Sequence, residues 1–194
     1  MDIYESCPQI ENEKYKLRLI SPNDRDDLLK VYSDKAAVRF FNSDNCHGDD
    51  FYYTTPDRME QAIKFWLCEY EKRYYVRFSI IDKNTSTVVG TIEIFNRISD
   101  DYFSNCGLLR LDIASRFENQ NDIKDILSLI INPIFQWFDC DKIATKAIPE
   151  AFERICALKY FGFALSNEKL IGGNSAEYDN YYVLKKKQEI KTNG

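Results

Sequence analysis

The sequence predicts a mixed β-sheet with helices on both faces, in the α/β (or α+β) class. Its 194 residues suit one domain, and 44% hydrophobic residues are enough to build a core. Segments with strand and helix periodicity follow in the order strand, helix, helix, three strands, helix, strand, helix, strand. We expect an N-terminal extension over residues 1–14, the domain over 15–186 and a polar tail over 187–194.

The first part of this order is a strand followed by two helices. Residues 16–21 alternate leucines with basic residues, which predicts a strand. Ser21 and the proline after it favour the start of a helix, because serine caps free N–H groups and proline suits the first turn. Thr55 and its following proline begin a second helix with apolar residues every three or four positions. A polar loop over 42–53 lies between them.

Three strands are predicted for the middle of the chain. Residues 74–80 and 88–94 form an antiparallel hairpin around a turn at 82–85. Gly90 marks a bulge or a close approach of two backbones. Leucine and isoleucine alternate over 109–113 and predict a further strand.

A long apolar stripe over 123–138 predicts the next helix, with Asn121 and Asp122 as capping candidates. Pro133 lies inside this stripe, and we expect it to kink or break the helix near residues 131–132. After it, residues 142–148 predict a short strand and 178–184 the final strand. A helix between these strands would start at a proline and end near a glycine, with one face formed by Phe152, Ile155, Cys156 and Lys159.

Composition excludes several function classes. A net charge of −5 argues against general binding to nucleic acid or to an anionic membrane surface. The start of the chain lacks the apolar region of a signal peptide, so we expect a cytoplasmic protein with six reduced cysteines. The spacing C-x-x-C is missing, and Cys46 and His47 are adjacent, which is poor geometry for chelating one metal ion. We therefore predict no metal site.

Six phrases in fixed order carry a resemblance to a known superfamily. They cover about nine-tenths of the chain: LRLISPND (17–24), TVVGTIEIF (87–95), LLRLDIASRFENQNDIKDIL (108–127), KIATKAIPE (142–150), LKYFGF (158–163) and YDNYYVLKK (178–186). Together they resemble the GNAT-type N-acetyltransferases, and more narrowly the branch that acetylates ribosomal-protein N-termini and small amines. The resemblance implies an acyl-CoA N-acyltransferase-like fold and acetyl-CoA as co-substrate.

In that superfamily the pantetheine arm of the cofactor pairs with a strand, and the loop after the strand holds the pyrophosphate with backbone N–H groups. Here the motif departs from the usual pattern: Glu118 opens it, and Asn121 and Ile123 stand at its glycine positions. The resemblance implies that the cofactor is bound by eight residues: Leu111, Ile113, Arg116, Asn119, Gln120, Asn121, Asp122 and Ile123.

Two alternatives stay open for this loop. Asparagine adopts left-handed conformations more readily than other non-glycine residues, so Asn119 and Asn121 could still form an anion nest. Alternatively, Asn121 and Asp122 only cap a helix. Glu118 and Asp122 flank the expected diphosphate position with Arg116 as the cation nearby, and this charge arrangement disfavours binding.

Other positions of the family pattern differ too. Relatives usually carry a cofactor-binding asparagine and serine where this chain has Ala151 and Arg154. The tyrosine that protonates the leaving thiolate in many relatives corresponds to Leu158, and Tyr160 lies on another helix face.

Acetyl transfer to an amine also needs a base and an acceptor pocket. Glu93 or Asp112 on the central strands could be that base; the alternative is a solvated strand face or an ion pair with Arg110. The loop over 42–53 would shape the pocket, with four substrate-binding candidates: His47, Asp49, Asp50 and Tyr52. Acidic and aromatic side chains suit a cationic amine or a basic peptide, although a solvated loop is the alternative.

The sequence thus predicts an N-acetyltransferase that transfers an acetyl group from acetyl-CoA to a primary amine, either of a small molecule or of a protein N-terminus. The alternative is a GNAT-fold protein with weakened or lost acetyl-CoA binding that serves as a ligand-binding or protein-interaction module. A homodimer is an option in either case.

Overall fold

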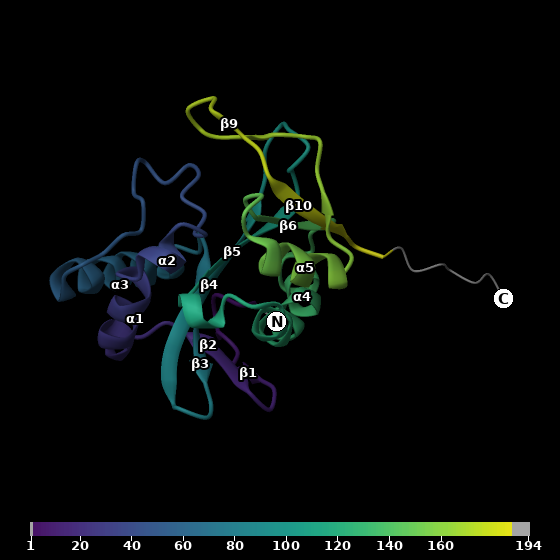
Figure 1. Ribbon diagram of the computed structural model, residues 1–194. Helices are drawn as coiled ribbons and strands as arrows, with labels where there is room; N and C mark the ends of the chain where they lie inside the picture. Colours follow the sequence, from purple (N-terminus) through teal and green to yellow (C-terminus); the bar gives the residue numbers. More distant parts are fainter. Residues whose placement is uncertain (1, 188–194) are drawn as a thin grey trace.

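The computed structural model describes residues 2–187, and within them one large mixed sheet dominates (Figure 1). Its strand order is β1-β2-β3-β4-β5-β6-β10-β7, and a separate pair β8-β9 lies beside it. The strands are β1 (Ile10–Glu11), β2 (Tyr15–Leu19), β3 (Val76–Asp82), β4 (Thr87–Arg97), β5 (Cys106–Ile113), β6 (Lys142–Lys146), β7 (Ala164–Leu165), β8 (Leu170–Ile171), β9 (Glu177–Tyr178) and β10 (Tyr181–Lys185). Neighbours pair antiparallel except β5 with β6, which run parallel.

Helices cover both faces of the sheet, which confirms the predicted fold class. The α-helices are α1 (Arg25–Tyr32), α2 (Lys35–Val38), α3 (Pro56–Glu71), α4 (Gln120–Phe138) and α5 (Phe152–Tyr160), and short 3-10 turns lie at η1 (Pro22–Asp24) and η2 (Ser115–Phe117). Figure 1 shows α1, α2 and α3 on one side of the sheet and α4 and α5 on the other. Two apolar clusters follow this division, one under α4 and one under α1 and α3.

Strand alternation sends different residues to the two faces. Val76, Phe78 and Ile80 of β3 pack into the cluster under α4. Arg77 and Ser79 of the same strand point the other way, because successive side chains of a strand face opposite sides. The face toward α1 and α3 therefore carries buried polar groups at the centre of the sheet.

Local signals act as expected at three positions. Ser21 forms a capping box at η1, and the Thr55 hydroxyl accepts the Arg58 backbone N–H at the start of α3. At Gly90 a Cβ atom would lie 2.2 Å from the backbone oxygen of Asp112, so only glycine allows β4 and β5 to pair here. The register also shifts at this point of the hairpin.

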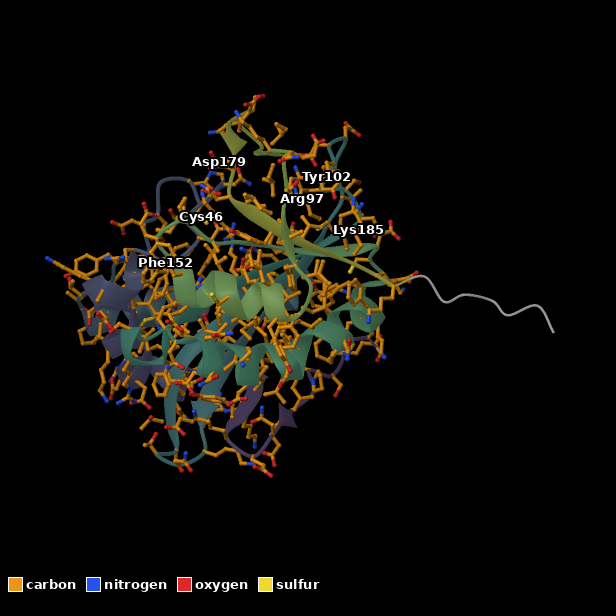
Figure 2. The ribbon with its side chains drawn as sticks, turned by 45° about the vertical axis from the view of Figure 1, so that its right-hand side comes forward. Cys46, Arg97, Tyr102, Phe152, Asp179 and Lys185 are labelled. Carbon is orange, nitrogen blue, oxygen red and sulfur yellow. The ribbon has the colours of Figure 1, made fainter. Side chains whose placement is uncertain are left out.

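The structure corrects two expectations about the later helices. Of the predicted kink or break at Pro133, the break is wrong: α4 continues to Phe138, because Ile130 and Ile134 are fully buried and their packing offsets the lost hydrogen bond. In α5 the predicted face is wrong: the buried residues are Arg154, Ala157 and Leu158. Phe152 is 73% exposed (Figure 2). A buried arginine with partners thus determines which way α5 faces.

Both ends of the chain differ from simple extensions. Ile3 is buried in the core and β1 pairs with β2, so the first residues pack on the domain. The final strand is divided into β9 and β10 around Asn180, which has φ 63°. From residue 188 on, the predicted polar tail lies outside the described residues.

Candidate functional site

The two parallel strands at the centre of the sheet separate partway along their length. Within the described residues, β5 pairs with β6 from Cys106 to Leu108. Beyond that point β5 continues to Ile113 while β6 ends at Lys146. The backbone of β5 from Leu109 onward therefore has an edge that β6 does not cover.

The side chain of Arg154 fills this gap. Its Nη1 donates to the backbone oxygens of Leu111 and Phe40, both at 3.0 Å. Its Nε and Nη2 donate to the two carboxylate oxygens of Glu118, both at 2.7 Å. The side chains of Arg154 and Glu118 are 3% and 7% exposed. The backbone oxygen of Leu111, a residue that the resemblance assigns to cofactor binding, is thus already bound by Arg154.

In the turn over residues 115–123, several backbone N–H groups donate to acceptors within the protein. Asn119 has extended backbone (φ −130°, ψ 156°) and caps α4, its side chain accepting the Asp122 N–H at 3.1 Å. The Gln120 N–H donates to the carboxylate of Glu153 at 2.8 Å. Asn119 and Asn121 both lie outside the left-handed region, so the turn is a capped helix start and not an anion nest. The cap is Asn119, whereas the predicted capping residues Asn121 and Asp122 lie inside the first turn of α4.

The remaining predicted cofactor residues have structural partners. Leu111, Ile113 and Ile123 are buried in the core under α4. Asp122 forms an ion pair with Lys14 and accepts the Tyr15 hydroxyl at 2.8 Å, and the Arg116 guanidinium lies over the Phe117 ring. Among the described residues, these side chains do not converge on one point.

Coenzyme A therefore does not fit this part of the structure. A diphosphate needs unpaired N–H donors and positive charge. This turn offers the carboxylates of Glu118 and Glu153, and the N–H groups of Gln120 and Asp122 already have acceptors. The gap next to it contains Arg154, which would have to leave four hydrogen bonds before a pantetheine arm could pair with β5.

A second polar assembly lies on the opposite face of the sheet, under α1 and α3. Arg77 is 1% exposed and its Nη1 donates to Tyr32, to Thr91 at 3.0 Å and to Asp112 at 3.2 Å. Its Nη2 binds the carboxylate of Glu93. The two predicted bases, Glu93 and Asp112, thus share one buried arginine.

These two carboxyl groups have opposite protonation tendencies. Burial opposes ionisation of both, but Arg77 and Arg110 hold the pKa of Glu93 below its usual value. For Asp112 burial dominates and raises the pKa, although Arg77 acts against it. Glu93 is therefore a paired carboxylate, while Asp112 is closer to its neutral form and donors from Tyr32 and Arg77 reach one of its oxygens.

A cavity of about 620 Å³ lies over this assembly, between the 42–55 loop, α3 and the sheet. Glu93 lines it together with Arg77 and Arg110, whereas Asp112 lies deeper in the protein and does not line it. Six further lining residues carry large aromatic side chains: Phe51, Tyr53, Phe65, Trp66, Tyr75 and Phe95. The shape and lining are those of a small-molecule pocket.

Of the four predicted substrate-binding residues, two line this cavity and two do not. His47 and Asp49 line it, but Asp49 is already bound by Arg58 at 2.6 Å and by the Tyr53 hydroxyl at 2.8 Å. Asp50 and Tyr52 are not among its lining residues: the carboxylate of Asp50 accepts the Tyr52 N–H, and the Tyr52 ring lies under Lys35.

The loop over this cavity is held in a strained form. Asn45, His47 and Phe51 have φ values of 58°, 55° and 58°. Such values are uncommon for non-glycine residues and unfavourable for a bulky one such as Phe51, so other contacts must hold them. One anchor is Asp44, whose carboxylate binds Lys146 at 2.7 Å and accepts the Tyr181 hydroxyl at 3.1 Å.

A further anchor of the loop is Arg110 of β5. Its Nη1 lies 3.0 Å from Cys46 Sγ, and its Nη2 donates to the Asp44 backbone oxygen at 2.9 Å. Burial raises the pKa of the Cys46 thiol, with Arg110 opposing, so Cys46 is held as a neutral thiol at the cavity wall (labelled in Figure 2).

Sequence reasoning missed Arg77, Arg154 and Trp66. A signal existed for Arg77: it is a charged residue between Val76 and Phe78 in a strand that reads as buried. For Arg154 the sequence shows only that an arginine replaces the serine of the family pattern, and not which groups it binds. Its role depends on Glu118, 36 residues away, and that pairing has no signature in a single sequence.

Within residues 2–187, no helix is long and apolar enough to cross a membrane. The same residues contain no group of three or more His, Cys, Asp or Glu side chains placed to hold a metal ion.

Comparison with solved structures identifies proteins that share this fold. No protein-family model and no curated protein matches the chain. Among solved structures, RimJ of Mycobacterium smegmatis in complex with CoA-disulfide is 14% identical, with 92% of this chain and 86% of that chain covered and a TM-score of 0.69. RimL, a ribosomal-protein α-N-acetyltransferase in complex with coenzyme A, is also 14% identical. The match covers 92% of this chain and 98% of that chain, with a TM-score of 0.69.

A GNAT-family acetyltransferase from Bacillus anthracis is 13% identical, with 92% of this chain and 98% of that chain covered and a TM-score of 0.66. The similarity extends over nearly the whole described chain, and it confirms the fold that the sequence phrases predicted. The chain therefore has the fold of the GNAT-type N-acetyltransferases, as found in the ribosomal-protein acetyltransferases.

Proposed function

We propose that this protein binds a small molecule in the cavity beneath the 42–55 loop, on a GNAT-type scaffold that does not hold coenzyme A in the gap between β5 and β6. The observation that carries the proposal is the position of Arg154. It forms four hydrogen bonds in that gap and leaves the β5 carbonyl of Leu111 engaged. The cavity on the other face of the sheet is open and lined by side chains able to bind a ligand.

The support for ligand binding is the way the loop is held. Arg110, Asp44 and Lys146 fix a backbone that has positive φ values at three residues, of which that of the bulky Phe51 is unfavourable. Such strain persists only where the surrounding structure over-determines it, and it concentrates at ligand-binding sites. The buried arginine and carboxylates beneath the cavity also cost solvation free energy, which a purely structural floor would not require.

A second candidate is acetyl transfer from acetyl-CoA to a primary amine of a small molecule or a protein N-terminus. The fold likeness favours it, because RimJ and RimL have CoA-type ligands in their structures. On this candidate Glu93 and Asp112 are the proposed bases. Leu111, Ile113, Arg116 and the residues over 119–123 are the proposed cofactor contacts, and a basic peptide is an alternative acceptor.

A thermal-shift titration with acetyl-CoA, coenzyme A and ATP separates the two candidates, with a CoA-binding acetyltransferase as positive control. A ligand at 100 times its Kd adds about 2.7 kcal/mol of stability. For a domain of this size that corresponds to roughly 5–11 °C in Tm. We expect no saturable shift for this protein.

A saturable shift with acetyl-CoA would refute the first candidate. Glu153→Gln then shows where the cofactor binds, because removing this exposed negative charge beside the 115–123 turn should tighten binding there and leave binding elsewhere unchanged. Mass spectrometry of a panel of amines and basic peptides incubated with acetyl-CoA would follow.

The first candidate has a direct test as well. Ligand-observed NMR against a library of small carboxylates, amines and neutral aromatics should yield binders that the cavity variant Phe65→Ala weakens. Phe65 is 58% exposed at the cavity, so its truncation should leave the fold intact. A library without any such binder would refute the proposed ligand-binding function.

A further inference from the structure

The charges that line the cavity are not those of an amine pocket. Three arginines line it, Arg58, Arg77 and Arg110, against two carboxylates, Asp49 and Glu93. Both carboxylates are already neutralised: Arg58 binds Asp49 at 2.6 Å, and Arg77 and Arg110 bind Glu93, the latter at 3.2 Å. A cationic ligand would therefore have to displace an arginine from its carboxylate.

Hydrogen-bond donors are also in excess at the floor of the cavity. The Nε atom of Arg77 is buried and has no hydrogen-bond partner among the described residues. The Arg110 guanidinium has five N–H donors, and its contacts with Cys46, Glu93 and the Asp44 backbone use at most three of them. Among the groups that line the cavity, Arg77 and Arg110 thus have N–H groups left for an acceptor, and a buried donor without an acceptor is unfavourable. Within residues 2–187 the oxygen Oδ1 of Asp112 also has no partner, but Asp112 does not line the cavity.

The rest of the wall suits a flat apolar group. The Trp66 ring stacks on the Arg77 guanidinium at 4.0 Å. Phe51 and Tyr53 lie on the loop side, and Phe65 is 58% exposed at the cavity. Aromatic walls of this kind bind planar rings through offset or edge-to-face contacts.

Resting on the ligand-binding function proposed above, we propose that the cavity takes a small organic carboxylate with an aromatic or other planar body. Its carboxylate binds the arginine-rich floor, with Arg110 as the main contact because that side chain is 13% exposed while Arg77 is 1% exposed. Its ring lies against Trp66 and the loop aromatics. Recognition of a planar carboxylate by a guanidinium is the strongest common form of charge-assisted hydrogen bonding.

Matched ligand series test the head group separately from the body. Phenylacetate, 3-phenylpropionate and indole-3-propionate are each compared with the amine and the alcohol of the same skeleton by isothermal titration calorimetry. We expect a carboxylate to bind at least about tenfold more tightly than its amine and alcohol counterparts, and to weaken with added salt. Equal or tighter binding of the amine or alcohol would overturn the carboxylate assignment while the ligand-binding function stands.

Two variants relate any preference to the arginines. Arg110→Met should weaken carboxylate binding by about 10- to 100-fold, while Arg110→Lys keeps the charge but loses the planar guanidinium and should weaken it less. The second variant is Arg58→Met. Arg58 is exposed, so the substitution should leave the fold intact. It leaves the Asp49 carboxylate without its arginine, which should shift the binding preference from the carboxylate ligand toward the amine. Arg73→Met, outside the cavity lining, is the control. A carboxylate-to-amine ratio unchanged in Arg110→Met and Arg58→Met would refute the proposal.

If instead the whole library described above contains no binder for the cavity, the ligand-binding function itself fails, and the carboxylate assignment fails with it. The two failures are therefore distinguishable: one is a wrong head group with binding retained, and the other is no binding of any class.

Discussion

Replacing Arg154 by methionine should be among the most destabilising single changes in the protein. Methionine keeps much of the length and apolar stem but removes the guanidinium. The carboxylate of Glu118, 7% exposed, would then remain without its charge partner. Two backbone oxygens, of Leu111 and Phe40, would also each lose a donor at 3.0 Å.

The magnitude follows from these contacts. Removing one partner of a buried ion pair costs about 3–5 kcal/mol, because an uncompensated charge stays buried. For a protein of 150–250 residues each kcal/mol shifts Tm by roughly 2–4 °C, so we expect Arg154→Met to lower Tm by about 6–20 °C. The double variant Arg154→Met with Glu118→Gln removes both charges and should be less destabilised than the sum of the two single variants.

The assay is a double-mutant cycle from urea unfolding at pH 7, read by fluorescence and circular dichroism. We expect a coupling free energy of about 1–3 kcal/mol between Arg154 and Glu118. A cost below about 1 kcal/mol for Arg154→Met, or strict additivity of the two changes, would refute the conclusion that this ion pair closes the gap between β5 and β6.

Three further predictions concern stability. Gly90→Ala should cost about 3 kcal/mol or more in chemical unfolding, because the added Cβ would lie 2.2 Å from a neighbouring backbone oxygen; a cost under about 1 kcal/mol would contradict the close pairing of β4 and β5. Asn119→Ala should cost about 1 kcal/mol through loss of the α4 cap, while the matched change Asn121→Ala should be nearly neutral; equal effects would argue against the cap. The third prediction concerns the carboxyl group of Asp101. Burial raises its pKa, but Arg97 and other hydrogen-bond donors outweigh burial and hold the pKa well below its usual range, so the folded state binds a proton at Asp101 less readily than the unfolded state. The stability that Asp101 contributes is therefore present at neutral pH and should be lost as the pH falls below about 4; Asp101→Asn should flatten that part of a Tm-against-pH curve, and an unchanged curve would count against it.

Much of the fold could be predicted from local sequence. The alternation in β2, β3 and β5 and the caps at Ser21 and Thr55 all follow from residues near each other in the chain. Gly90 stands out in a strand pattern, although the backbone that it approaches belongs to Asp112 on the neighbouring strand. These signals have a short range, since they arise from backbone sterics and from hydrogen bonds within one turn or between paired strands.

The candidate site was less accessible to such reasoning. Sequence periodicity put Glu93 and Asp112 on central strands, but it did not identify Arg77 as the partner of both. It also made Asp49 a candidate for binding a cation, whereas Arg58 occupies that carboxylate. In each case the partner of a charge decides its chemistry, and partners from separate elements are brought together only by packing.

Local pattern and the resemblance thus predicted the longer strands and helices in their order, the caps at Ser21 and Thr55 and the scaffold, but not the short elements β1, α2, β7 and β8. Only the tertiary structure decided which way α5 faces, and through it that Arg154 enters the gap between β5 and β6. The physical reason is that a buried arginine is tolerated only where acceptors meet it. Those acceptors come from Phe40, Leu111 and Glu118, which lie 114, 43 and 36 residues away along the chain.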